Sequence, residues 1–278
     1  MILIFLILLA LFQATMVDYL YNNPTYYQLD GAVWETDAFR ALRLGESVCR
    51  LEELDFDQLT ALMVEHGYDL TGVDSLQADS APIRAAKPEA YEKLKQAYET
   101  ILGDLVYFPI PLNEAAEVPD VTYSDSWGDG RTYGGDRRHE GCDIMGEEKP
   151  RGFYPVVSMS DGVVEKVGWL EQGGWRIGVR SPSGAYLYYA HLYRYEREWK
   201  EGDPVRAGEL LGFMGDSGYG KEEGTVGNFP VHLHVGIYLE TDNYEELSVN
   251  PYWALKYLEK RRLRANFRCG RSPAPPPA

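Results

Sequence analysis

Residues 228–240, NFPVHLHVGIYLE, place two histidines one residue apart inside an apolar run. In a β-strand, side chains at positions i and i+2 lie on the same face. His232 and His234 are therefore expected to point together, while the apolar residues between and after them point into a core. Gly236 continues the histidine face without a side chain, which leaves room for something to approach. Paired imidazoles suit zinc, copper, iron or nickel, although an isolated H-x-H is more often a solvent-facing or core-satisfied pair.

The remaining histidines favour a metal site over that simpler interpretation. The chain has only five histidines. His139 opens the segment HEGCD, in which Asp143 follows four residues later, and His191 closes GAYLYYAHL (184–192). Two histidines and one carboxylate form a common catalytic zinc shell whose fourth position is open to water. His139, Asp143 and one member of the H-x-H pair would supply this shell, and two histidines would remain to move protons.

Five pieces of sequence carry a resemblance to a known family. In chain order they are RRHEGCDI (137–144), SMSDGVVEKVGW (158–169), YLYYAHLYRY (186–195), KEGDPVRAGELLGFMGDSG (200–218) and VHLHVGI (231–237). With them, residues from about Asp125 to Asn250 resemble the LytM/lysostaphin-type zinc metallopeptidases, which cut peptide bridges in bacterial cell walls. The resemblance implies a mainly β catalytic domain, with an antiparallel sheet and a substrate groove.

The same resemblance gives roles to the histidines. It implies that His139, Asp143 and His234 bind a zinc ion, and that His191 and His232 stay unligated beside it. A zinc ion lowers the pKa of bound water towards about 7, and proton transfer by a positioned side chain contributes about 10²–10⁴ in rate. The unligated pair would accept the proton of this water or stabilise the oxyanion. The sequence does not divide these two tasks between the two histidines.

Three other residues lie close to His139 in the sequence. Tyr133 lies six residues before His139, where some members of the family place a tyrosine that stabilises the intermediate. Glu140 is interpreted as a surface residue, because the chain has no HExxH helix that would make it a general base. Thiolates bind zinc, but the resemblance puts Asp143 on the metal, so Cys142 is expected to be a small, buried packing residue.

Short strand-like runs separated by turn signals independently predict an antiparallel β architecture. The runs lie at 154–159, 162–169, 175–181, 185–192 and 231–239. The glycine-rich residues 125–141 are expected to form a loop that delivers His139, and residues 213–230 a loop that forms one wall of a cleft. Alternation puts Tyr189 on the face of His191, where it would either line the groove or pack as an aromatic core residue.

The chain divides into four predicted parts. Residues 1–17 are a membrane anchor or signal segment, 18–106 a helical N-terminal region, 107–255 the metallopeptidase domain, and 256–278 a basic, proline-rich tail. The first part, MILIFLILLALFQATMV, has no charged side chain and approaches the length of a membrane-spanning helix. The missing charged start and the absence of a small-x-small site favour an uncleaved anchor over a cleaved signal. The rest of the chain would then lie outside the cytoplasmic membrane, with secretion as the alternative.

The helical region carries no recognisable chemistry. Helices are expected over 56–70 and from Pro88 onward, and His66 on the first of them is interpreted as structural. The region would serve as a spacer, as a lid over the substrate, or as a docking module for an unidentified protein. The sequence does not choose among these roles.

Composition restricts the partners. The formal net charge is −16, and this acidic body argues against nucleic acid as the main substrate, because phosphate binding needs clustered cations. The basic tail is expected to be flexible, and would either bind anionic polymers or act as a solubilising end. Three cysteines, Cys49, Cys142 and Cys269, cannot all pair within the chain. Their number leaves the compartment open.

The leading hypothesis is a zinc endopeptidase that acts on peptidoglycan peptides outside the cytoplasmic membrane. A second hypothesis is a catalytically silent wall-binding or interaction module on the same fold. All five site positions are filled, which counts against silence. A third is a metal protein of the cupin kind, in which further ligands would follow the H-x-H pair, whereas His139 and Asp143 precede it here.

Overall fold

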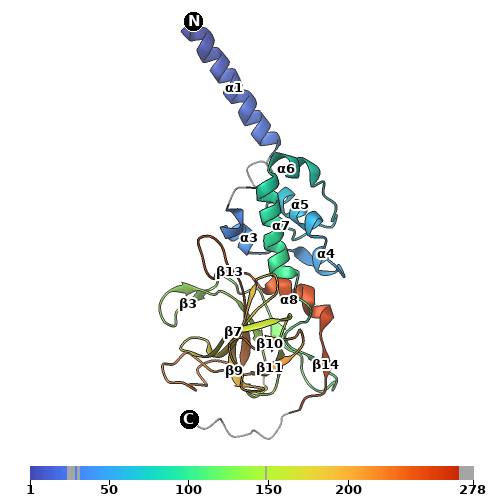
Figure 1. Cartoon of the computed structure of the whole chain (residues 1–278), viewed down its shortest axis with the longest axis vertical. Helices are drawn as coiled ribbons and strands as arrows, with labels where there is room; N and C mark the ends of the chain where they lie inside the picture. The colour runs from blue at the N-terminus through green and yellow to red at the C-terminus, as the bar shows by residue number, and fades with distance from the viewer. Residues whose placement is uncertain (24–28, 30–31, 148, 269–278) are drawn as a thin grey trace.

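The computed structural model describes residues 1–268 except 24–28, 30–31 and 148. Figure 1 shows α1 at one end of the molecule, a group of short helices next to it, and a β-rich body beyond them. Within the described residues the helices are α1 (Ile2–Asn22), α3 (Asp37–Arg40), α4 (Gly45–Cys49), α5 (Phe56–Glu65), α6 (Ala81–Ala86), α7 (Pro88–Leu102) and α8 (Tyr252–Leu258), with 3₁₀ turns η1 (Val33–Glu35) and η2 (Glu259–Arg261).

The strands belong to one large sheet and two small ones. They are β1 (Leu112–Asn113), β2 (Thr122–Tyr123), β3 (Gly130–Arg131), β4 (Arg137–Arg138), β5 (Cys142–Met145), β6 (Pro155–Val157), β7 (Gly162–Leu170), β8 (Gly174–Arg180), β9 (Tyr186–Tyr195), β10 (Pro204–Val205), β11 (Leu210–Met214), β12 (His232–Leu239), β13 (Leu247–Val249) and β14 (Arg264–Ala265). All five predicted strands are present, and the mainly β, antiparallel fold is confirmed.

The large sheet has ten strands and follows the order β10-β7-β8-β9-β12-β5-β2, with β6, β11 and β13 attached beside this path. Strand β12 lies between β9 and β5, so it joins segments that are remote in sequence. Its register sets His234 opposite Asp143 of β5 on one side and opposite Ala190 of β9 on the other. The alternation predicted for β12 holds, because Leu233 and Val235 are fully buried on the core face.

Alternation along β9 breaks at its histidine. Tyr189 points into the core, where it is fully buried and its hydroxyl accepts a hydrogen bond from the Met159 amide at 2.8 Å. His191 nevertheless faces the groove together with Ala190. The cause is local: His191 has a φ of +62°, and the pairing of β9 with β8 slips in register beside it. A residue in the left-handed region turns the chain, so two consecutive side chains share a face.

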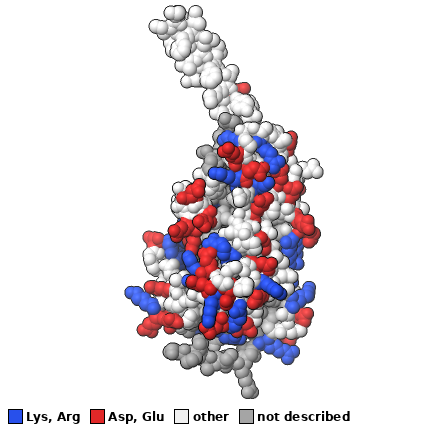
Figure 2. Space-filling view, viewed as in Figure 1, with Lys and Arg blue, Asp and Glu red and all other residues white. Residues whose placement is uncertain are grey.

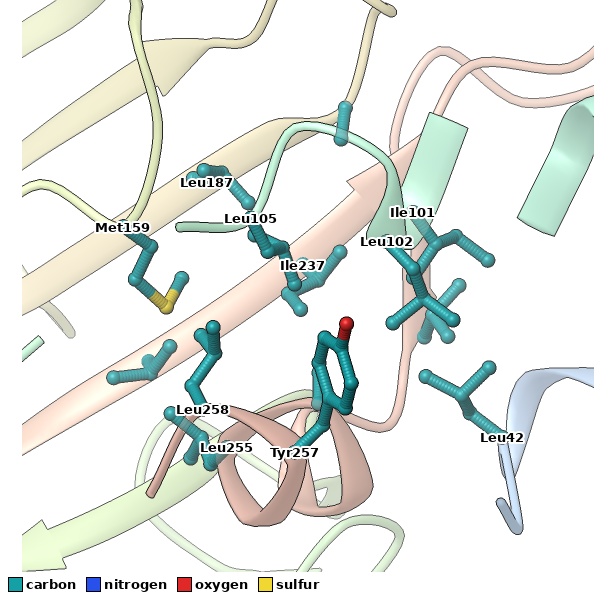
Figure 3. Packing of buried hydrophobic residues seen from close by; sticks show 14 of the residues in the cluster. Leu42, Ile101, Leu102, Leu105, Met159, Leu187, Ile237, Leu255, Tyr257 and Leu258 are labelled. Atoms are coloured by element: carbon teal, nitrogen blue, oxygen red, sulfur yellow. The ribbon is translucent and has the colours of Figure 1, made fainter. Parts of the chain in front are cut away.

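The helical region packs on the core face of the sheet, opposite the histidines. Figure 3 shows Leu105 beside Leu187 of β9 and Ile237 of β12, and Leu102 next to Ile101 at the end of α7. These residues belong to one continuous hydrophobic cluster that extends through both regions. On the described residues, the region therefore shares the core of the β-domain, which does not fit a loose spacer.

Polar contacts fix the same junction. The Arg40 guanidinium donates to the carbonyl of Ser248 at 2.8 Å and to its hydroxyl at 2.9 Å, and the Asn250 amide donates to the Arg40 carbonyl. Helix α7 begins at Pro88 as expected, but α5 ends at Glu65, earlier than the predicted 70. Its end is set by Gly67 and Tyr68, which both have positive φ values.

Helix α1 extends away from the rest of the described structure (Figure 1). None of its residues is buried, and its 18-residue core has a mean hydropathy of 2.2. At 1.5 Å per residue its 21 residues extend about 31 Å, close to the thickness of the hydrocarbon layer of a bilayer. Figure 2 shows it almost without charged atoms, in contrast to the mixed acidic and basic surface of the body. Length and composition alone make it a candidate membrane span.

The first part of the basic tail is folded rather than flexible. Strand β14 pairs in parallel with β1, and the guanidinium of Arg262 binds both carboxylate oxygens of Asp120 at 2.6 and 2.7 Å. The sequence interpretation overlooked that its basic residues have acidic partners upstream. Residues 269–278, with Cys269, lie outside the described residues.

Candidate metal centre

Three predicted ligands converge on one point. Nε2 of His139, Nδ1 of His234 and Oδ1 of Asp143 form a triangle with sides of 3.0, 3.0 and 3.1 Å. His139 comes from the end of the 125–141 loop, Asp143 from β5 and His234 from β12. The cross-strand pairing of His234 with Asp143 therefore builds half of the site directly into the sheet.

Backbone carbonyls fix the orientation of three imidazoles. Nδ1 of His139 lies 2.9 Å from the carbonyl oxygen of Ser126, Nδ1 of His191 lies 2.7 Å from that of Ser217, and Nδ1 of His232 lies 2.8 Å from that of Pro230. A carbonyl oxygen only accepts a hydrogen bond, so Nδ1 is the protonated nitrogen in each case. Each ring thus leaves Nε2 with a free lone pair.

Asp143 is held from two directions. Its Oδ1 faces the two histidines, and its Oδ2 accepts a hydrogen bond from Nη2 of Arg131 at 3.0 Å. Burial disfavours the ionised carboxylate, but the imidazoles of His139 and His234 outweigh burial and hold the pKa of Asp143 well below its usual range. Arg131 was not singled out from the sequence, because its position in the short β3–β4 hairpin gives no local signal.

A glycine allows the third ligand its position. A Cβ at Gly141 would lie 2.5 Å from two ring atoms of His234 and 2.5 Å from the carbonyl oxygen of Val235. Real Cβ atoms do not approach other atoms so closely, so any side chain at 141 would displace the ring. Gly141 therefore belongs to the architecture of the site, although it contributes no ligand.

The other two histidines lie beside the triangle. The ring of His191 is 4.6 Å from that of His232 and 6.0 Å from that of His234, measured between centroids. Nε2 of His232 lies 3.8 Å from Oδ1 of Asp143, farther than either predicted ligand. Phe229, from the 213–230 loop, packs against the rings of both His191 and His232. The structure thus brings all four predicted histidines and Asp143 together.

Burial keeps these imidazoles neutral. It lowers the pKa of His191, His232 and His234 below the usual value, and the nearby carboxylate of Asp143 offsets only part of the effect. Metal ligands must be deprotonated, and neutral imidazole is the form that binds zinc. The lowered pKa of His234 therefore favours the form of this ligand that binds metal.

The donor set fits zinc. Two nitrogen atoms and one oxygen atom whose lone pairs face a common point lie 3.0–3.1 Å apart, which is repulsive unless a cation or a proton lies among them. A tetrahedral zinc ion with bonds of about 2.0–2.1 Å needs ligand atoms roughly 3.3–3.4 Å apart. A small outward movement of each side chain would satisfy this requirement.

The weaker sequence assignments have mixed outcomes. The hydroxyl of Tyr133 lies 3.3 Å from Oε1 of Glu171, and its ring stacks on Tyr219 at 4.5 Å; its catalytic role stays a prediction. Cys142 is fully buried as expected, burial raises the pKa of its thiol, and its Sγ donates to the carbonyl of Ser124. Glu140 is exposed as expected, although it borders the groove.

A groove of about 330 Å³ runs from the histidines along the face of the sheet. Tyr219, from the 213–230 loop, forms part of its wall, as predicted for that loop. Its floor contains Tyr186 and Tyr188 of β9 and Tyr238 of β12. Sequence reasoning missed these three tyrosines. Their alternation with Leu187 and Ile237 was a usable signal, because it places them on the face opposite the core.

Comparison with known proteins agrees with this geometry. Residues 137–251 match the model of peptidase family M23. The chain is 42% identical over 171 residues to the L-Ala–D-Glu endopeptidase of Bacillus subtilis, a match that covers 61% of the chain and 49% of the relative. It is 37% identical over 67 residues to the glycyl-glycine endopeptidase ALE-1 of Staphylococcus capitis, covering 23% of the chain and 18% of that protein. The match thus covers about half the length of the Bacillus subtilis relative and less than a fifth of the Staphylococcus capitis relative.

A solved structure extends the likeness to the helical region. The crystal structure of a protein assigned as glycyl-glycine endopeptidase LytM from Ruminococcus gnavus superposes with a TM-score of 0.75 at 39% identity. This superposition covers 88% of the chain and 99% of that structure. Family model, sequence identity and fold agree with the histidine and aspartate geometry: the chain belongs to peptidase family M23.

Proposed function

We propose that the chain is a zinc-dependent endopeptidase that hydrolyses peptides of bacterial peptidoglycan. The single observation that carries the proposal is the triangle of His139, Asp143 and His234, whose three donor atoms lie within 3.0–3.1 Å of one another. The endopeptidase names of the relatives support the substrate class. Family membership supports zinc over the other metals that imidazole binds.

His139, Asp143 and His234 would hold the metal, and Arg131 would keep the carboxylate in place. Zinc supplies Lewis acidity, which activates water and polarises a carbonyl. His191 and His232 each present a free Nε2 lone pair beside the ligands, because Nδ1 is committed to a backbone carbonyl. Either ring can accept a proton at Nε2 and then donate it as an N–H bond to a developing oxyanion. Phe229 packs against both rings and would help to hold them in place.

Tyr133 would assist as a hydrogen-bond donor at the mouth of the groove. Its hydroxyl lies on Glu171, so it must leave that carboxylate to reach a substrate. Stacking on Tyr219 keeps its ring at the groove wall. This assignment rests on the family resemblance more than on the present contacts of the side chain.

The proposal places the enzyme outside the cytoplasmic membrane, anchored through residues 1–17 within α1. The apolar, uncharged surface of this helix supports an anchor or a signal segment. The two are distinguished by the mass of the protein recovered from membranes. An anchor is retained at full length, whereas a signal segment is removed.

The function is tested with the full-length chain purified in detergent. We expect it to bind about one zinc ion and to release soluble peptide fragments from purified cell walls. A chelator should abolish the release, and added zinc should restore it. Walls that are bound without any release of fragments by the zinc-loaded protein would instead support a silent wall-binding module.

A further inference from the structure

The groove contains a buried arginine, two of whose nitrogens have no hydrogen-bond partner among the described residues. Arg176 of β8 is only 9% exposed, and within the described part of the chain neither its Nε nor its Nη1 has a hydrogen-bond partner. Burying an unpaired charge is costly. A buried guanidinium that points into a substrate groove therefore indicates a bond that forms when the substrate arrives.

The contrast with the next arginine on the same strand is direct. Four residues along β8, the guanidinium of Arg180 donates to both carboxylate oxygens of Glu165 and, at 2.9 Å, to the carbonyl oxygen of Gly184. Arg180 does not line the groove, whereas Arg176 does. On the same strand, Arg180 thus has a structural carboxylate partner, whereas Arg176, which faces the groove, has none among the residues that the structure describes.

Two of the three carboxylates that border the groove have other bonds, and the third, Glu140, is exposed. Asp143 is held by the two imidazoles and Arg131, and Glu246 forms an ion pair with Lys166 at 2.5 Å. The tyrosine floor does not neutralise Arg176 either. Burial raises the pKa of Tyr188, and the positive charge of Arg176 offsets this only in part, so the phenol stays protonated and uncharged.

The position of Arg176 on the sheet defines what it can reach. Arg176 lies on β8 between the pairs that β8 forms with β9 at Trp175 and Ile177, and His234 on β12 pairs with Ala190 of β9. One strand therefore separates Arg176 from His234, a Cα separation of roughly 10 Å at the usual strand spacing. A separation of roughly 10 Å corresponds to about three residues of extended peptide. The arginine side chain itself covers part of this distance. The missing anion must belong to a residue next to the scissile bond.

We propose that Arg176 recognises a free carboxylate on a substrate residue adjoining the scissile peptide bond, which makes the chain selective for acidic wall peptides. This inference rests on the proposed function and narrows its substrate class. A guanidinium matches a carboxylate with two parallel hydrogen bonds. A D-glutamyl residue in a peptide keeps one carboxyl group free, and the 42%-identical relative is an endopeptidase named for the L-Ala–D-Glu bond. A glycyl-glycine bridge offers no such group.

The test compares three synthetic peptides on the full-length, zinc-loaded chain. One contains L-Ala–D-Glu with the free carboxylate, one has that carboxyl replaced by a carboxamide, and one contains Gly–Gly. We expect kcat/KM to be at least about tenfold higher for the carboxylate than for the carboxamide. In Arg176→Gln, kcat/KM for the carboxylate peptide should fall by about 10²-fold. This variant should then cut the carboxylate and carboxamide peptides equally well. Arg180→Gln is the matched control and should keep the preference.

A second readout separates recognition from folding and from catalysis. Arg176→Met removes an unpaired buried charge, so we expect its Tm to rise by a few degrees, whereas an arginine with a structural role would lower it. Calorimetric titration with chelator present, so that nothing is hydrolysed, should show tighter binding of the carboxylate peptide than of the carboxamide. That difference should vanish in Arg176→Gln.

Three results would overturn the inference. They are equal binding of both peptides by the unmodified chain, a preference that survives Arg176→Gln, and a preference that is lost in Lys166→Gln instead. Failure of the proposed function has a different signature: the zinc-loaded chain releases no wall fragments, while the binding preference is still measurable. Wall fragments whose new N-terminus is glycine would support the proposed function. They would also refute the inference that Arg176 recognises a substrate carboxylate.

Discussion

The two ends of the groove treat charge in opposite ways. At the histidine end the ligand carboxylate has partners on both oxygens: Asp143 faces two imidazoles through one oxygen and Arg131 through the other. At the tyrosine end Arg176 is buried with two of its nitrogens unbonded. The difference indicates that the histidine end is assembled before any ligand arrives, whereas the tyrosine end is completed by the substrate. Substitutions at the histidine end should therefore affect the metal, and those at the other end should affect the choice of peptide.

The largest effect is expected from Asp143→Asn. The substitution keeps the shape of the side chain but replaces a charged ligand by a neutral amide, so zinc should be lost. We expect release of wall fragments to fall by at least about 10³-fold. Zinc content after dialysis and fragment release are the two measurements. Asp136→Asn, at an exposed carboxylate in the same loop, is the matched control and should bind zinc normally. Retention of stoichiometric zinc by Asp143→Asn would remove Asp143 from the ligand set.

His232→Ala should separate chemistry from metal binding. Its Nε2 lies 3.8 Å from Asp143 Oδ1, outside the triangle of ligand atoms, so zinc should stay. The rate should fall by about 10²–10⁴, the usual contribution of proton transfer by a positioned group. If the variant loses zinc, the division of the H-x-H pair into a ligand and an assisting residue is wrong. Normal cleavage of walls would rule out its catalytic role.

Arg131→Gln is expected to weaken the metal without removing it. Groups that hold a ligating side chain typically contribute about 10–100-fold in metal affinity, and Arg131 is the group bonded to the outer oxygen of Asp143. Competition with a chelator measures the zinc affinity, and excess zinc should restore activity. Arg138→Gln, on the partner strand of the same hairpin, is the control. Equal affinities in the two variants would mean that the contact with Arg131 does not hold the carboxylate.

The smallest effect is expected from Tyr133→Phe. The hydroxyl rests on Glu171, so only the fraction of molecules in which it leaves that carboxylate can use it on a substrate. We expect kcat/KM to fall by about tenfold, the worth of one ordinary hydrogen bond, with the zinc content unchanged. Tyr244→Phe, at an exposed tyrosine, serves as the control. A rate identical to that of the unmodified chain would exclude Tyr133 from the reaction.

Properties that depend on neighbours along the chain could be predicted from the sequence. The two-residue period of β12 placed both histidines on one face and Leu233 in the core, as the structure has them. Helix α7 was expected from its proline start and its apolar spacing. Family resemblance then joined the remote segments that a single-strand argument cannot connect.

Properties that depend on register and packing could not be predicted. The turn at His191 needs a left-handed residue inside a strand, a conformation that is uncommon for any residue other than glycine. Arg131 and Arg176 stand in unremarkable sequence, and their roles follow from what the sheet places opposite them. The helical region was expected as a spacer, lid or docking module, and only the tertiary structure places Leu105 against the sheet.

The shape of the groove depends on glycines, which have no side chain. The three floor tyrosines lie flat because glycines stand beneath them: an added Cβ at Gly173 would meet the hydroxyl of Tyr188 at 2.2 Å, at Gly178 that of Tyr186 at 2.0 Å, and at Gly236 the ring of Tyr238 at 2.5 Å. One methyl group at any of these positions would displace an aromatic ring of the floor and change the shape of the groove. A substitution at one of these glycines could thus change which peptides fit the groove without replacing any of the predicted metal ligands.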